Sequence, residues 1–256
     1  MGRIIAVSNQ KGGVGKTTTV VNLSAALGLK GKKVLIVDFD PQGNTTTSLG
    51  ISKKSIRYTS YEMLVDECEV FEAIVATQFR GISVIPATKS LAGAAIELVD
   101  YSDRAVRLKS QLEKVREEYD FILIDCPPSL DLITINALSA ADSALIPIQC
   151  EFLSLEGLVE LVDTIKRIRK SSNPTLEIEG ILFTMYVSRY KLTEQVTKEV
   201  SKYFKKEVFE TVIPRNIALS EAPSFGEPVL YYDKKSKGAK AYEELAKEII
   251  KKNRKV

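Results

Sequence analysis

The sequence predicts a single-domain α/β protein in which helices cover both faces of a doubly wound, mainly parallel sheet. Three observations support this prediction. Short, continuous apolar runs alternate with segments whose apolar residues recur at helical spacing, a pattern typical of strands buried on both faces. A glycine-rich loop follows the first apolar run and precedes a helical segment. No linker, repeat or low-complexity segment interrupts the 256 residues, so we expect one domain over residues 1–256.

The expected strands are the continuous apolar runs, taken in chain order. They cover residues 3–8, 33–38, 82–86, 121–125, 143–148, 178–185 and 207–213. The first expected helix begins at Lys16, because Val20, Leu23 and Leu27 recur at helical spacing after it. Further helices are expected at residues 91–99, 104–117, 131–141, 155–170, 192–204 and 239–252, the last with an apolar stripe that includes Tyr242 and Leu245.

The loop between the first strand and the first helix has the composition of a phosphate-binding loop. It reads Lys-Gly-Gly-Val-Gly-Lys-Thr-Thr over residues 11–18. Glycines allow a tight turn that directs backbone N–H groups at an anion, and the start of the helix adds its partial positive charge. Lys16 supplies a charge for the outer phosphates, and Thr17 supplies a hydroxyl for Mg²⁺. We therefore expect nucleotide contacts from Lys11, Gly12, Gly13, Val14, Gly15, Lys16, Thr17 and Thr18.

Lys11 departs from the general pattern of such loops. The pattern places a glycine where this chain has Gln10, and the chain carries an additional lysine at position 11. A second lysine facing its own phosphates would crowd a loop already served by Lys16. We therefore expect Lys11 to point outward, to a nucleotide held by another subunit.

Three aspartates follow apolar strands and supply candidate groups for the chemistry. In a parallel sheet these strand ends meet at the edge where ligands bind. Asp125 closes a strand and is expected to hold Mg²⁺ or its water shell, with a helix-capping role as the alternative. The chain has no histidine, so a carboxylate is the natural group to orient the attacking water, and we assign this role to Asp40. Asp38 is expected in the Mg²⁺ shell or, alternatively, as a simple strand-end turn residue.

The polar segment that follows Asp40 is expected to be a loop. Residues 43–47 read Gly-Asn-Thr-Thr-Thr, and a polar loop at this position would sense the γ-phosphate and reorder on hydrolysis.

Composition and charge narrow the class of protein. Hydrophobic residues make up 45% of the chain, and no apolar run approaches the ~20 residues that cross a bilayer. The three cysteines are far apart in the sequence, as expected for small buried residues in a reducing cytoplasm, and the early strand predicts no signal peptide. Residues 233–256 carry nine Lys/Arg and four Asp/Glu, a surplus of +5 that indicates either a polyanionic partner or a solubilising last helix.

Several strings together resemble the ParA/Soj chromosome-partitioning ATPases, which belong to the deviant Walker A group. The strings are residues 11–18, Asp38-Phe-Asp-Pro-Gln-Gly-Asn44, Ile124-Asp-Cys-Pro-Pro-Ser129, Ile213-Pro-Arg-Asn216 and Ser220-Glu-Ala-Pro-Ser224. The resemblance covers nearly the whole chain. It implies a P-loop fold, a weak ATPase that uses Mg²⁺, and an ATP-dependent homodimer in which Lys11 reaches the partner's nucleotide. It further implies binding to double-stranded DNA without sequence preference, stimulation by a ParB-type protein, and a cytoplasmic, nucleoid-associated location.

The resemblance also indicates where the adenine and the DNA would bind. It places the adenine near Met185, Pro214, Arg215 and Asn216, with Met185 as core filler the alternative. It places DNA contacts at Arg189, Lys251 and Lys252, each of which is otherwise a solvated surface charge. The chain has Ala218 where relatives often carry a basic residue, so that contact is missing or moved to a neighbour such as Lys234 or Lys237.

Two other functions fit parts of the sequence. A regulator similar to MinD would need a C-terminal amphipathic anchor facing lipid. The apolar stripe of the last helix is instead typical of core packing, so we expect no stable membrane association. A metabolic relative similar to dethiobiotin synthetase would phosphorylate a small molecule, and the strings quoted above favour partitioning over that function.

Overall fold

The structure is a computed structural model that describes residues 2–151 and 154–253. At its centre lies a seven-stranded sheet with the order β3-β4-β2-β5-β1-β6-β7. All neighbouring strands are parallel except β3, which runs antiparallel to β4. The strands are β1 (Arg3–Val7), β2 (Val34–Asp38), β3 (Val75–Ala76), β4 (Ile82–Ile85), β5 (Phe121–Asp125), β6 (Ser143–Gln149) and β7 (Glu177–Thr184). The predicted α/β class and mainly parallel sheet are confirmed.

Helices precede, connect and follow these strands, and several are shorter than expected. The described helices and 3₁₀ segments (η) are α1 (Lys16–Leu29), α2 (Asn44–Ser48), α3 (Ser60–Leu64), α4 (Val70–Ala73), α5 (Leu91–Glu97), η1 (Leu98–Asp100), α6 (Arg107–Glu113), η2 (Arg116–Glu118), α7 (Leu132–Ala140), α8 (Ser154–Lys170), α9 (Lys191–Tyr203), α10 (Ile217–Glu221), η3 (Ala222–Phe225), α11 (Val229–Tyr232) and α12 (Lys237–Asn253). The helix expected at 104–117 is divided between α6 and η2.

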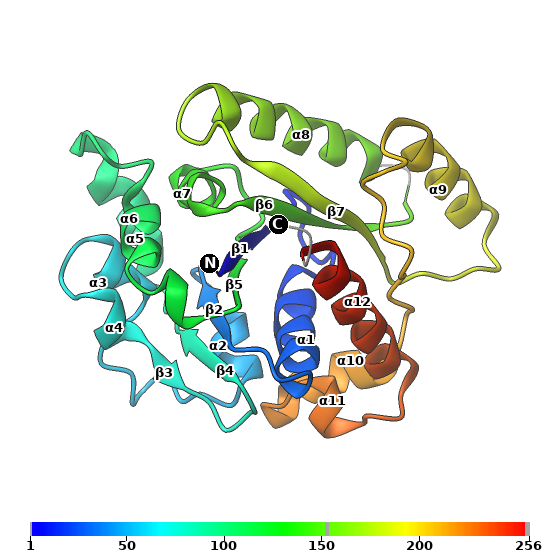
Figure 1. Cartoon of the computed structure of the whole chain (residues 1–256), viewed down its shortest axis with the longest axis horizontal. Coiled ribbons are helices and arrows are strands. Elements are labelled where there is room, and N and C mark those ends of the chain that lie inside the picture. The colour runs from blue at the N-terminus through cyan, green and yellow to red at the C-terminus, as the bar shows by residue number, and fades with distance from the viewer. Residues whose placement is uncertain (1, 152–153, 254–256) are drawn as a thin grey trace.

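Alternating side chains of the central strands enter two separate apolar cores. In β1, Ile4 packs on the face covered by α5, α6, α7 and α8, whereas Ile5 packs on the face covered by α1 and α12. Figure 1 shows α1 beside α12 on one side of β6 and β7, with α7 and α8 on the other side. The stripe of α12 is buried here, and the Tyr242 hydroxyl lies 3.2 Å from that of Thr19 in α1. The last helix therefore supports the helix that follows the glycine-rich loop.

The strand expected at residues 207–213 is absent from the described sheet, and that prediction is wrong. The segment runs beside β7 but forms only isolated bridges, from Val208 to Ile181 in β7 and from Pro214 to Tyr186 just after it. Between these points the amides of Glu210 and Thr211 donate to the Glu248 carboxylate of α12, at 2.8 and 3.1 Å. The Phe209 and Ile213 amides donate to β7, but the Thr211 amide between them is taken by Glu248, so the ladder is interrupted and the apolar run does not become an eighth strand.

The prediction of a loop at residues 43–47 is also wrong, because Asn44–Ser48 form the short helix α2. Gly43, with φ 60°, precedes it in the left-handed conformation that glycine adopts without a steric penalty. The helix ends near Gly50, whose backbone packs against that of Gly226 after η3: a Cβ on Gly226 would lie 2.6 Å from the Gly50 Cα. Direct backbone contact thus joins α2 to the C-terminal segment.

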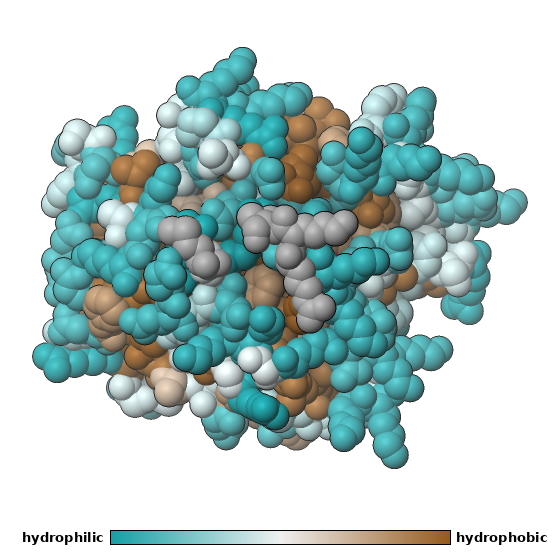
Figure 2. Space-filling model, in the orientation of Figure 1, coloured by the Kyte–Doolittle hydropathy of each residue, from teal (hydrophilic) through white to brown (hydrophobic). Residues whose placement is uncertain are grey.

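The surface is mainly hydrophilic on the face drawn in Figure 2, with hydrophobic residues in small patches between hydrophilic ones. Cys68 and Cys126 are buried as expected, whereas Cys150, which follows β6, is only partly buried. In the described part of the chain, none of the helices is long and apolar enough to cross a membrane.

Candidate nucleotide-binding site

The glycine-rich loop joins β1 to α1 at the carboxyl edge of the sheet, as predicted. Gly13 (φ 74°) and Gly15 (φ 90°) take left-handed conformations that turn the chain into the helix. A Cβ added to Gly12 or Gly13 would meet no atom within 4 Å, so both residues border open space. Gly15 is the N-cap of α1 and has no side chain to satisfy the first amides of the helix. The loop therefore presents an open cradle of N–H groups that fits a phosphate chain.

Lys16 lies at the floor of this cradle. The residue is only 7% exposed, and its ammonium donates to the Lys11 carbonyl oxygen at 3.1 Å. Burial lowers the pKa of Lys16, while the nearby charge of Asp125 acts in the opposite direction. A partly desolvated ammonium aimed into the loop interacts strongly with an incoming phosphate.

Asp125 connects the loop to α2. Its Oδ2 accepts hydrogen bonds from the hydroxyls of Thr17 and Thr45, both at 2.8 Å. Its Oδ1 is buried and has no partner among the described residues. The alternative of a helix-capping role belongs to Asp131 instead, which accepts from the amides of Ile133 and Thr134 at the start of α7.

These groups fit Mg²⁺. A carboxylate oxygen without a partner and a threonine hydroxyl beside it are the oxygen donors that Mg²⁺ takes together with waters and phosphates. Within residues 2–151 and 154–253, no group of three or more His, Cys, Asp or Glu side chains is placed to hold a metal ion. A cation bound here would thus depend on the nucleotide for part of its coordination.

Asp38 lies beside Asp125 in the register of β2 and β5. Its Oδ2 accepts from the Thr46 amide at 2.8 Å and from the Thr46 hydroxyl at 2.6 Å. The structure therefore brings Asp38 to the predicted metal region but directs its carboxylate to α2. Sequence reasoning missed Thr45 and Thr46; the one available signal was the run of three threonines after Asn44.

Asp40 lies in the turn that follows β2 and is 8% exposed. Its Oδ1 accepts from the Gln42 amide at 2.9 Å, which fixes the side chain at the start of the turn. Its own amide contacts the Asp38 carboxylate at 3.4 Å. The three aspartates are therefore held together at one edge of the sheet, as their positions after strands predicted.

The buried aspartates predict a pH dependence of stability in the nucleotide-free chain. Burial is the main cause that raises the pKa of Asp125 to about 7 and that of Asp38 to about 6; the charge of Asp38 adds to the rise at Asp125, and the charge of Asp40 adds to the rise at Asp38. Because unfolding returns both to about 3.9, the folded chain holds more protons between about pH 4 and 7. We expect the free energy of unfolding to fall as pH rises through this window.

Urea unfolding of the wild type and of Asp125→Asn, at about pH 5 and about pH 8, measures this effect. Asparagine stays neutral, so the variant should lose less stability between the two pH values than the wild type. Equal losses in the two proteins would show that Asp125 is already ionised at the lower pH.

The residues predicted to hold adenine lie around one cavity of about 280 Å³ beside the loop. Asn216 lines the cavity, and its buried Oδ1 has no partner among the described residues. Met185 is 41% exposed and has a φ of 49°, so the alternative role of core filler does not describe it. The cavity lining includes Gly15, Thr18, Thr184, Met185, Pro214, Arg215 and Asn216.

The Lys11 side chain contacts a residue outside the glycine-rich loop. Its ammonium forms an ion pair with the Glu151 carboxylate, which follows β6, while its amide donates to the Asn9 Oδ1 at 2.9 Å. Glu151 was not identified from the sequence, because 140 residues separate it from Lys11 and no local pattern joins them.

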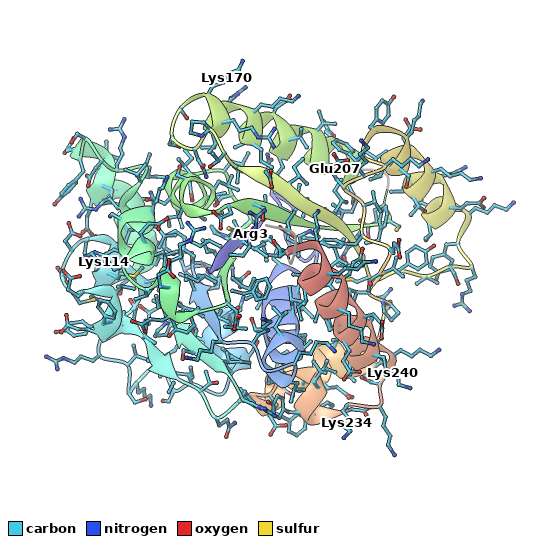
Figure 3. All side chains as sticks on the ribbon, viewed as in Figure 1. Arg3, Lys114, Lys170, Glu207, Lys234 and Lys240 are labelled. Atoms are coloured by element: carbon cyan, nitrogen blue, oxygen red, sulfur yellow. The ribbon has the colours of Figure 1, made fainter. Side chains whose placement is uncertain are left out.

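The residues predicted to contact DNA do not form one cluster. Arg189 is exposed in the turn after the carboxyl end of β7, where its guanidinium lies 5.6 Å from the centre of the Tyr190 ring. Lys251 is exposed on α12, but the Lys252 ammonium donates to the carbonyl oxygen of Glu179, near the start of β7. Arg254 and Lys255, at the basic end of the sequence, lie outside the described residues. Figure 3 shows Lys234 and Lys240 at the border of the molecule beside α11 and α12.

Comparisons of the sequence and of the structure with known proteins identify similar nucleotide-binding and chromosome-partitioning proteins. The family described as an AAA domain matches residues 2–178. The chain is 56% identical over 249 residues to the sporulation initiation inhibitor protein Soj of Bacillus subtilis, covering 97% of this chain and 98% of Soj. It is 51% identical over 253 residues to the chromosome partitioning protein ParA of Myxococcus xanthus, covering 99% and 89%. Its structure is similar to that of cobyrinic acid a,c-diamide synthase from Mycobacterium smegmatis with bound ADP and magnesium, with a TM-score of 0.86, 38% identity and coverage of 98% and 94%.

Proposed function

The chain belongs to the family of Soj and ParA chromosome-partitioning ATPases, and we propose that it is a partitioning switch driven by ATP. Binding of Mg-ATP closes two copies face to face, and the closed dimer binds double-stranded DNA without sequence preference. A ParB-type protein stimulates the slow hydrolysis of ATP, after which the dimer separates. The observation that supports this proposal is that the two lysine ammonium groups have different partners: Lys16 donates within the loop, to the Lys11 carbonyl oxygen, whereas Lys11 pairs with Glu151 outside the loop.

The proposed hydrolysis depends on positioning and charge, as phosphoryl transfer generally does. The loop amides and Lys16 bind the β- and γ-phosphates, and Asn216 and its neighbours hold the adenine. Thr17 and Asp125 would hold Mg²⁺, which when bound neutralises charge that develops on the phosphate oxygens. Asp40 orients the attacking water by accepting its hydrogen bond. Lys11 of the second copy completes the site with a preorganised positive charge.

The contacts of α2 support a route from hydrolysis to the rest of the molecule. Thr45 and Thr46 bond to Asp125 and Asp38, so a change at these carboxylates alters the support of α2. The packing of Gly50 on Gly226 then carries the change to the segment around η3. We propose that this segment, together with the basic surface of α12, links the nucleotide state to DNA affinity.

A membrane-associated regulator similar to MinD is the second candidate, and the packing of α12 disfavours it. Tyr242, Leu245 and Ile249 are at most 1% exposed, so they are not available to lipid in this structure. A vesicle co-sedimentation assay with Mg-ATP separates the two functions, because the partitioning protein should stay in the supernatant. The identity to Soj and ParA is also higher than that to the synthase, which favours partitioning over small-molecule chemistry.

Lys11→Ala tests the proposal directly. The variant should bind Mg-ATP, since Lys16 and the loop amides remain, but it should stay monomeric and lose ATP-dependent DNA binding. Light scattering after size-exclusion chromatography with Mg-ATP measures the dimer, and an electrophoretic shift with random-sequence DNA measures the second effect.

Lys30→Ala is the matched control, because Lys30 is an exposed lysine at the opposite end of α1. This control should dimerise and bind DNA like the wild type. Normal dimerisation of Lys11→Ala would contradict the proposal that Lys11 contacts the nucleotide bound by the second subunit.

A further inference from the structure

Other hydrogen bonds surround the ion pair between Lys11 and Glu151 and join the same two segments of the chain. Three side-chain contacts join the carboxyl end of β6 and the residues after it to the segment that contains the glycine-rich loop. Asn9 donates to the Pro147 carbonyl oxygen at 2.8 Å, Gln149 donates to the Gly13 carbonyl oxygen at 3.0 Å, and Lys11 pairs with Glu151. Backbone bonds also hold Glu151, because its amide donates to the Gln149 carbonyl oxygen and its carbonyl oxygen accepts from the Ser154 amide. The carboxylate is therefore held within reach of Lys11 by the fold.

We propose that Glu151 is a positioning residue that holds Lys11 inside its own protomer and thereby opposes formation of the ATP dimer. This inference rests on the proposed function, in which the same ammonium crosses to the partner's nucleotide. In this proposal the Lys11 ammonium leaves the Glu151 carboxylate when it crosses to the partner's nucleotide, so each protomer breaks its Lys11–Glu151 pair as the site of the other is completed. Once Lys11 has left, the Glu151 carboxylate also remains near a face that receives negatively charged phosphates.

The exposure of the Lys11 and Glu151 side chains determines how strongly their ion pair should affect the affinity of the dimer. The side chains are 33% and 55% exposed, so solvent screens the pair. An ion pair of this kind changes an equilibrium constant by about 1.4- to 5-fold. A twofold dimer requires two such pairs to break, so removal of Glu151 should tighten the dimer by about 2- to 30-fold. Removal of Glu151 should therefore change the affinity of the ATP-bound dimer and leave the residues that bind ATP within each protomer unchanged.

The test compares Glu151→Gln with Glu156→Gln in the full-length chain carrying Asp40→Ala to prevent hydrolysis. Glu156 is exposed in the first turn of α8 and makes no hydrogen bond or ion pair with the described residues, so it controls for the loss of one charge in this region. Analytical ultracentrifugation with Mg-ATP gives the dimer dissociation constant of each protein. We expect a lower constant for Glu151→Gln, no change for Glu156→Gln, and a smaller difference between the two at high salt.

Two results would overturn the inference: a dimer of unchanged affinity in Glu151→Gln, or a weaker one, which would place Glu151 in the closed dimer as a stabilising group. Glu151→Ala, measured in parallel, should change the affinity in the same direction as Glu151→Gln. Lys11→Ala in the same background separates this inference from the proposed function. If Lys11→Ala is monomeric while Glu151→Gln behaves like the control, only the inference fails. If Lys11→Ala dimerises, the proposed function fails.

Discussion

An Asp40→Ala variant is expected to bind Mg-ATP and dimerise but to hydrolyse ATP about 100- to 10,000-fold more slowly than the wild type, the range that a positioned acid–base group contributes. Asp40 is the aspartate of the site whose carboxylate is not committed to a side chain of α2. Its Oδ1 is oriented by the Gln42 amide, which leaves the rest of the carboxylate to face the nucleotide. Phosphate release under single-turnover conditions measures the rate, and light scattering measures the dimer.

Asp40→Asn is the matched variant for this prediction. Its side-chain oxygen still accepts from the Gln42 amide, so the turn after β2 is retained while the negative charge is lost. Both variants should therefore be slow and dimeric. Hydrolysis at the wild-type rate in Asp40→Asn would mean that the turn geometry, and not the carboxylate charge, is what the reaction requires.

Lys16→Met is expected to weaken Mg-ATP binding by roughly 10- to 150-fold, the range for hydrogen bonds to charged groups. Methionine preserves much of the buried stem of Lys16, which packs at the floor of the loop. The change therefore removes the ammonium without opening a large cavity. Isothermal titration of the nucleotide-free protein measures the affinity, with the melting temperature as a check of folding.

Lys11→Met serves as the comparison for this second prediction, because it also converts a loop lysine to methionine. It should keep near-normal affinity for Mg-ATP in the dilute, monomeric protein. If Lys16→Met bound ATP as tightly as the wild type, the phosphates would have to be held by the loop amides alone.

Much of the fold could be predicted because short stretches of sequence determine its strands and the loop between β1 and α1. Continuous apolar runs such as Ile4–Val7 form strands buried on both faces, and the glycine pattern defines the loop between β1 and α1. The positions of Asp38 and Asp125 at the ends of adjacent strands follow from the parallel sheet alone. Local information of this kind predicts which residues meet at the carboxyl edge.

The errors arise where a distant partner competes with the local pattern. Residues 207–213 have the pattern of a strand, but Glu248 accepts from the Thr211 amide, which a continuous ladder with β7 would need. Threonines are poor helix formers, yet α2 forms because Asp125 and Asp38 hold Thr45 and Thr46 through side-chain and backbone bonds. The contact of Glu151 with Lys11 could not be predicted either, because the two residues are far apart in the sequence and meet only in the folded chain.

The central place of β1 has a consequence for biosynthesis. Among the strands of the sheet β1 is synthesised first, but its neighbours are β5 and β6, which pair Ile5 with Leu123 on one side and with Ser143 on the other. At ordinary rates of translation the segment waits on the order of ten seconds before both neighbours emerge. A nascent chain that ends before β6 therefore contains the glycine-rich loop but lacks the neighbouring strands of β1. We expect nucleotide binding only after β5 and β6 have been translated.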